Sequence, residues 1–210
     1  MENALTRSNA SFLVSVDEYL ATWIPLVAAL TLSFWGERVR DVTQALGLRF
    51  HPLDLLWGIG IGCVGRAADA TLRLLVTGST GAGSAPTLSA IGGPDIQTTA
   101  VGILAPVIIA PLLEELYFRG LIQRSLAEAF SRLGTVAKWA AAVVLTSTAF
   151  AAVHTLLLLA APSEALLAGV STFVFALAAG TTAAATNRLG GAMVGHVVFN
   201  GLGVLLAWPA

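Results

Sequence analysis

The sequence predicts an all-α membrane protein, a polytopic bundle of about six transmembrane helices around a polar cavity. Hydrophobic residues make up 56% of the 210 positions and charged residues only 11%, whereas about a quarter of a soluble domain is charged. Six apolar segments are long enough to cross a bilayer, which takes about 20 helical residues. Ionisable residues nonetheless lie inside these segments, where they are expected to face the bundle interior instead of lipid.

The predicted spans follow one another along the whole chain, at about residues 18–36, 53–77, 97–119, 137–161, 163–187 and 190–208. The segment 78–94 is rich in Gly, Ser and Pro and is therefore expected to be a loop outside the membrane. No linker or internal repeat separates the spans. We expect one integrated domain, with N-terminal spans and a loop in residues 1–98 and a catalytic helical core in residues 99–208.

The third predicted span continues into a stretch that is too long for one straight crossing. At about 1.5 Å per residue, the segment 96–130 exceeds the hydrocarbon thickness by more than half. Pro106 and Pro111 can kink it. After Gly120 the pattern becomes amphipathic, which is typical of an interfacial extension of the helix.

Basic residues predict how the bundle is oriented. The connections after spans one, three and five carry Arg or Lys, whereas those after spans two and four carry neither. Basic connections stay in the cytoplasm, so both termini are expected outside. The net charge of −1 and the lack of a basic patch exclude a nucleic-acid partner. The single Cys63 excludes an intramolecular disulfide.

Two adjacent carboxylates interrupt the third apolar segment, in the sequence LLEELYFRGL. A charge at the centre of a membrane helix costs about 2.5–3.5 kcal/mol on insertion scales, so these residues are expected to have a function. Glu115 and Arg119 are four residues apart and can pair on one helix face. Glu114 is left free to face a cavity and act as a general base. The competing interpretation is a charge cluster that only holds helices together.

Two histidine motifs follow at helical spacing. Phe150 and His154 are four residues apart in the fourth span, and His196 and Asn200 are four apart in the sixth. An imidazole and a carboxamide on one face can hold an oxyanion. Each pair alone could equally be a packing or interhelical hydrogen-bond feature. A turn near residues 133–134 would bring Glu114 and His154 to a similar depth, and together the motifs predict one convergent site.

At these motifs the chain resembles the CPBP intramembrane proteases, which include the type II CAAX prenyl endopeptidases and bacterial abortive-infection or bacteriocin-immunity proteins. EELYFR, FAAVH and HVVFN match the family patterns EExxxR, FxxxH and HxxxN over about residues 99–205. The resemblance implies that Glu114 and His154 activate a water. It also implies that His196 and Asn200 stabilise the oxyanion. Glu115 and Arg119 would shape the site, with Phe150 in support.

The expected function is therefore a membrane-embedded endopeptidase that hydrolyses a peptide bond of a membrane-associated peptide or protein. We expect it in a cell membrane, as a multi-pass protein of a bacterial plasma membrane. No cofactor is favoured. A zinc-dependent version of the same hydrolase stays open, with Glu114, His154 and His196 as ligands, although HExxH is absent and Asn is a poor zinc ligand. A non-catalytic immunity or interaction protein and a proton-coupled transporter also stay open.

Two features of the second span need separate interpretation. GIGCVG matches a dinucleotide-binding pattern but lies in a membrane helix without a preceding strand, so Gly58 and Gly62 instead predict a GxxxG face for close helix packing. Arg66, Asp69 and Arg73 share one face. They form either an internal ion-pair cluster near the outer end or part of the substrate cavity.

Overall fold

The computed structural model describes residues 2–80, 100–156, 158 and 162–207, and every regular element in these ranges is helical. The predicted all-α class is confirmed. The elements are α1 (Glu2–Ser33), α2 (Val39–Leu46), α3 (Pro52–Thr77), η1 (Ala100–Ile109), α5 (Ala110–Glu115), η2 (Leu116–Ile122), α6 (Gln123–Ala129), η3 (Ser131–Leu133), α7 (Thr135–Leu156), α8 (Pro162–Thr186) and α9 (Gly190–Ala207).

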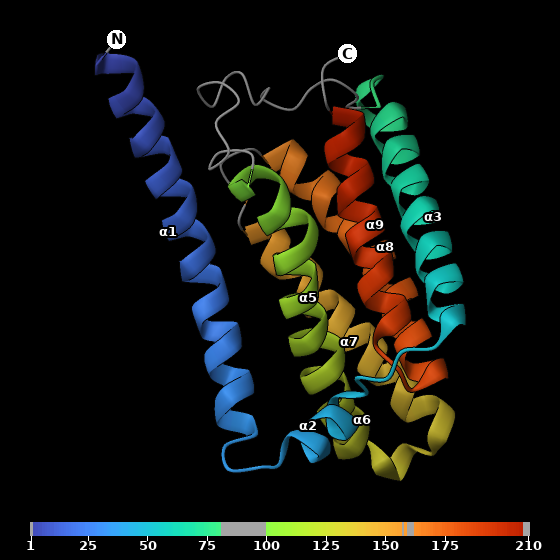
Figure 1. Ribbon diagram of the computed structural model, residues 1–210. Helices are drawn as coiled ribbons and strands as arrows, with labels where there is room; N and C mark the ends of the chain where they lie inside the picture. The colour runs from blue at the N-terminus through green and yellow to red at the C-terminus, as the bar shows by residue number, and fades with distance from the viewer. Residues whose placement is uncertain (1, 81–99, 157, 159–161, 208–210) are drawn as a thin grey trace.

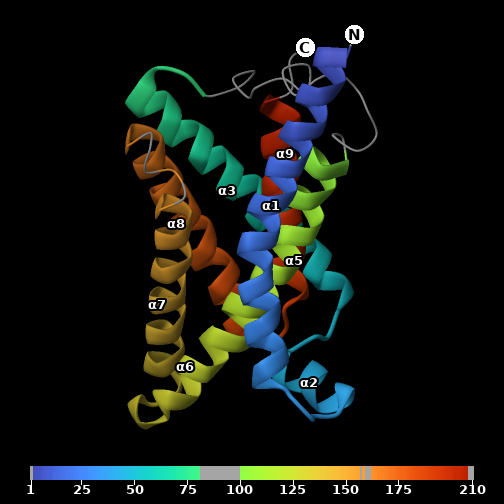
Figure 2. The same cartoon turned by 90° about the vertical axis from the view of Figure 1, so that its left-hand side faces the viewer.

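The long helices run roughly side by side (Figure 1). The most extensive packing joins α3 to α9 and α7 to α8, and α3 also packs on α8. The chain from η1 to α6 crosses the bundle as one nearly continuous helix and contacts α9 and α7. Helix α1 stands at one edge of the bundle (Figure 1) and lies in front of α5 when the view is turned (Figure 2). Among the described residues its main contacts are with η1, α5 and η2.

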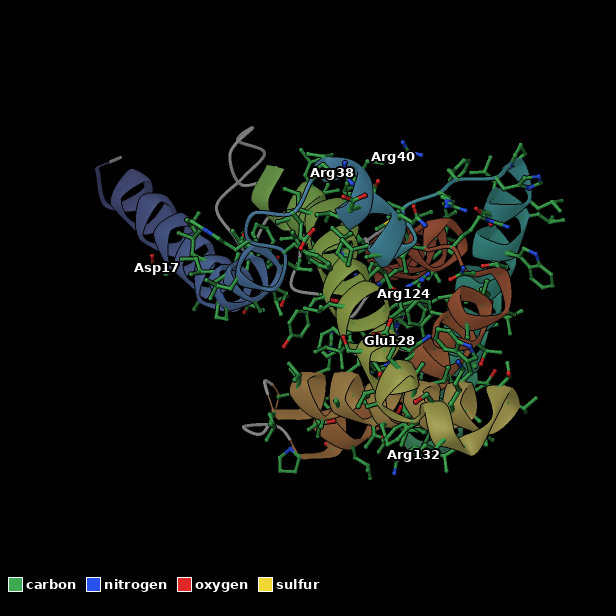
Figure 3. All side chains as sticks on the ribbon, turned by 90° about the horizontal axis from the view of Figure 1, so that it is seen from below. Asp17, Arg38, Arg40, Arg124, Glu128 and Arg132 are labelled. Atoms are coloured by element: carbon green, nitrogen blue, oxygen red, sulfur yellow. The ribbon has the colours of Figure 1, made fainter. Side chains whose placement is uncertain are left out.

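The two ends of the bundle differ in charge. The start of α1 and the end of α9 lie at one end (Figure 1). The opposite end holds α2 and α6 and, with them, Arg38, Arg40, Arg124 and Arg132 (Figure 3). The basic connections therefore gather at the end that the charge pattern assigns to the cytoplasm.

Two helices in the described residues, α7 and α8, are long and apolar enough by themselves to cross a membrane. Shorter apolar stretches lie in α1 (Tyr19–Ser33) and α9 (Gly190–Leu206). Six spans thus stay a prediction, because α3 carries several charged residues and the third segment is broken into shorter elements. Most of the predicted loop, from residue 81, and residues 157 and 159–161 at the end of the predicted fourth span lie outside the described residues.

The structure differs from the sequence predictions at the start of α1 and agrees with them at the turn near Gly134. Helix α1 begins at Glu2, well before residue 18, because no Gly or Pro interrupts the polar segment ahead of the apolar one. The turn expected near residues 133–134 is present, since η3 ends at Leu133 and Gly134 has a φ of +77°. Because glycine adopts a positive φ without steric cost, the chain can reverse at this position.

The glycines of the GxxxG motif allow α3 and α9 to pack closely. A β-carbon at Gly58 would lie 2.5 Å from the Val194 side chain, and one at Gly62 would lie 2.6 Å from Val198. Real carbon atoms do not approach so closely, so α3 and α9 touch at this distance only because side chains are absent. This contact fixes the depth and rotation of α9, which carries His196 and Asn200.

Candidate active site

The third predicted span is not a uniform α-helix. Its first part, η1, and the later part, η2, are π-helical and flank the short α5 (Figure 1). In π-helical register the amide that would bond the Pro106 carbonyl is that of Pro111, which has no N–H. Asn200 Nδ2 donates to this carbonyl at 2.8 Å. Proline chemistry thus creates an unsatisfied acceptor, and α9 supplies the donor.

Glu115 is the most deeply buried member of the site, with none of its surface exposed. Its Oε1 accepts a hydrogen bond from Arg119 Nη1 at 2.9 Å, one helical turn further along. The same oxygen lies 2.9 Å from His196 Nδ1 on α9. The pairing of Glu115 with Arg119 follows the predicted spacing, whereas the contact with His196 was not predicted.

Glu114 occupies a different position from its neighbour. Its Oε2 lies 3.7 Å from His196 Nε2 and 3.9 Å from His154 Nε2, so a carboxylate and two imidazoles surround one small volume. Both separations exceed a direct hydrogen bond and leave room for a bridging water. The structure thus brings Glu114, His154 and His196 together from three separate helices.

The partners of the two Nδ1 atoms decide which ring nitrogens carry protons. His154 Nδ1 lies 2.9 Å from the Phe150 carbonyl, and His196 Nδ1 faces the Glu115 carboxylate. Both partners are acceptors, so each Nδ1 must be the donor. In the neutral rings each Nε2 therefore presents a lone pair toward Glu114. Such a set of three acceptors attracts a water, a proton or a metal ion.

Aromatic rings hold this polar group in place. The Phe150 ring lies 4.9 Å from Phe118, 4.4 Å from His154 and 5.7 Å from His196, measured between centroids. The Arg119 guanidinium carbon lies 4.4 Å above the Phe150 ring, which is a cation–π contact. Phe175 covers the other side of His196 at 5.0 Å. Phe175 carries no sequence signal that distinguishes it from other core aromatics.

A cavity of about 590 Å³ opens in front of Glu114 and His154. Its remaining wall is mostly apolar and comes from α1, η2 and α7, with Leu26, Tyr117 and Val153 among the lining residues. His196 is only 3% exposed and lies behind Glu114. In the described residues, the hydrogen bond of Asn200 goes to Pro106 and not to another site side chain.

The residues present fit a zinc ion in kind. Metal-ligating histidines typically donate their Nδ1 protons to fixed acceptors, as both imidazoles do here. With the Glu114 carboxylate as the third ligand, one position would be left for water. Within the described residues, no group of three such side chains has the geometry of a formed metal site. If zinc binds, Glu114, His154 and His196 would hold it, and it would activate the bound water.

The charged cluster of α3 lies apart from this cavity. Arg66 donates to Asp69 and, through Nη2, to the Phe199 carbonyl at 2.7 Å, while Arg73 bridges Asp69 and Glu164 of α8. None of Arg66, Asp69 and Arg73 is among the described lining residues of the cavity. The geometry therefore matches the internal ion-pair cluster, which ties α3 to α8 and α9.

The chain matches one known family over the region that forms this site. Residues 96–202 match the family described as type II CAAX prenyl endopeptidase Rce1-like. Searches among curated proteins and among solved structures gave no significant match. The matched region contains the polar side chains of the candidate site, from Glu114 to Asn200. Because the match covers half of the chain, the protein belongs to the type II CAAX prenyl endopeptidase Rce1-like family, a family of membrane-embedded peptidases.

Proposed function

We propose that the protein is an intramembrane endopeptidase in which Glu114 activates a water for attack on a peptide bond of a membrane-associated substrate. The observation that carries this proposal is the convergence of Glu114 Oε2 with the two Nε2 atoms at 3.7 and 3.9 Å, beside a cavity with an apolar wall. A water held there would lie within reach of a base and of an incoming carbonyl.

The reaction assigns a different task to each group. Glu114 takes a proton from the water while His154 Nε2 accepts its second hydrogen bond, and the resulting oxygen adds to the carbonyl carbon. The C–N bond then breaks as Glu114 returns the proton to the leaving amine. The oxyanion needs donors. His196 can donate through Nε2 only when both ring nitrogens are protonated, and Asn200 has a second N–H beside the one given to Pro106.

Replacement of Glu114 by Gln tests the proposal. The amide keeps the size of the side chain but cannot act as a base, so cleavage should be abolished while the fold is retained. Mass spectrometry of peptides trapped by the Glu114→Gln variant would identify the substrate. Glu164→Gln is the matched control, because this exposed carboxylate lies at the outer ion-pair cluster. Unchanged turnover in Glu114→Gln would contradict the assignment.

The zinc-dependent hydrolase is a second candidate, favoured by the two Nδ1 hydrogen bonds that leave both Nε2 lone pairs free. Prolonged chelation distinguishes the two. Loss of cleavage on chelation, restored by added zinc, would support the metal, whereas full activity after chelation would support Glu114 acting without one.

A transporter and an immunity or interaction protein make different demands on where ionisable groups lie. A proton relay of a transporter needs such groups at successive depths, whereas Glu114, His154 and His196 meet at one point. An immunity or interaction protein would keep its partner when Glu114 is changed to Gln and would show no cleavage. We also propose six crossings of a bacterial plasma membrane, with both termini outside.

A further inference from the structure

A buried polar column leads away from the candidate site inside the bundle. Glu115, Arg119 and Gln123 follow one another at intervals of four residues, at the end of α5, in η2 and at the start of α6, and each is at most 1% exposed. On α7, Thr146 and Ser147 are equally buried. We refer to these five side chains as the polar column.

Contacts at both ends show that the two halves of the column face each other. The Arg119 guanidinium lies over the ring of Phe150. Gln123 reaches the neighbourhood of Val143, because a β-carbon at Gly180 would lie 2.7 Å from Gln123 Oε1 and 3.3 Å from Val143 Cγ1. The helices run in opposite directions, so residues 146 and 147 lie at a depth between Arg119 and Gln123.

Several atoms of the column have no hydrogen-bond partner among the described protein atoms, although all are buried. They are Glu115 Oε2, Arg119 Nε and Nη2, Gln123 Oε1, Thr146 Oγ1 and Ser147 Oγ. Buried polar atoms in native proteins are almost always paired with protein or with ordered water. The amide nitrogen of Gln123 is paired, since Nε2 donates to the Gly180 carbonyl at 3.0 Å, which leaves only Oε1 without a partner among the described atoms.

On α7, hydroxyl groups without a hydrogen-bond partner among the described residues occur on the buried face, whereas other hydroxyl groups of the same helix are paired. Thr148 and Thr155 donate to the carbonyls four residues earlier, Val144 and Ala151, each at 2.9 Å. That local bond satisfies a hydroxyl without any outside partner. Thr146 and Ser147 belong to the same helix but do not make it. Their hydroxyls are instead available to a ligand between α7 and η2–α6.

We propose that the polar column binds a file of ordered water molecules that supplies water to the active site. The unpaired set contains both donors and acceptors, which suits water and does not suit a single ion. One end of the column is Glu115, whose other oxygen holds His196. The opposite end is Gln123, which begins α6 at the end of the bundle that carries Arg124 and Arg132 (Figure 3).

The role in hydrolysis rests on the proposed function, whereas the presence of the waters does not. An active site enclosed by apolar helices needs a route for water that does not cross lipid. The cavity of about 590 Å³ in front of Glu114 is lined mainly by apolar groups and is the expected place for the substrate. The column reaches the same cluster from behind, through Glu115 and His196.

Thermal unfolding of the purified full-length protein in detergent tests the waters directly. Thr146→Val replaces the hydroxyl by a methyl group of similar size. If a water bonds Oγ1, Tm falls, because that bond is lost. If Oγ1 is unsatisfied, Tm stays the same or rises, because removing an unpaired buried hydroxyl is neutral or stabilising. Thr148→Val is the matched control on the same helix. A Tm of Thr146→Val equal to or above that of the wild-type protein overturns the proposal.

Gln123→Met tests the supply of water, with the cleavage of the trapped substrate as the readout. We expect kcat to fall by about tenfold or more, with KM unchanged, because substrate does not touch this residue. An unchanged kcat overturns the supply role. If the wild-type protein shows no cleavage, the proposed function fails, but the Tm comparison still decides whether the column binds water.

Discussion

Gly62→Ala perturbs the site through the backbone without changing any polar group. A β-carbon at this position would lie 2.6 Å from the Val198 side chain and 2.8 Å from the Gly195 carbonyl. Non-bonded carbon atoms prefer about 3.5–4.0 Å. The added methyl group therefore has to separate α3 from α9 by about 1 Å at the contact point. Of the two residues displaced, Gly195 directly precedes His196, and Val198 lies two positions before Asn200.

The expected losses follow from this displacement. Overpacking of a close contact costs about 1–3 kcal/mol of stability. A catalytic group displaced by about 1 Å can lose about 10²-fold in rate. We therefore expect the kcat/KM of Gly62→Ala to fall by about two orders of magnitude, together with a lower Tm.

Gly60→Ala is the matched control on the same helix. A β-carbon there would have no atom within 4 Å, so the change introduces no clash. Alanine favours helix over glycine by about 1 kcal/mol, and Tm should stay the same or rise. Purified variants would be compared for cleavage and for thermal unfolding. If Gly62→Ala cleaves substrate as fast as Gly60→Ala, then the α3–α9 contact does not position the site.

Three further predictions concern charge and topology. Glu115→Gln leaves the guanidinium of Arg119 buried without a counter-charge, which should cost about 3–5 kcal/mol in unfolding experiments; the exposed Glu164→Gln should change stability by no more than about 1 kcal/mol. Arg66→Met breaks the bond to the Phe199 carbonyl and should lower Tm while kcat/KM of the folded protein persists; a large fall in kcat/KM would connect this cluster to the site. A reporter fused to the C-terminus should be active outside the cytoplasm, and cytoplasmic activity would refute the predicted orientation.

Much of the helical architecture could be predicted because it depends on local chemistry. Apolar length, basic connections and Gly134 predict where helices lie and where the chain reverses. The spacing of four residues predicts the Glu115–Arg119 pair, since both partners belong to one helix. Two predictions stayed coarse: α1 extends back to Glu2 through a polar segment, and the apolar proline-containing segment adopts π-helical turns that the pattern did not indicate.

The candidate residues could be identified from the sequence alone, because ionisable side chains in apolar segments stand out whatever the fold. The sequence also distinguished the paired Glu115 from Glu114. The packing of the helices was needed to see that His196 bonds Glu115, 81 positions away, and that Asn200 bonds the Pro106 carbonyl, 94 positions away. Spacing along one helix says nothing about the rotation and depth of another. Those are set by the packing of α9 on α3 and by the acceptor that Pro111 leaves unsatisfied.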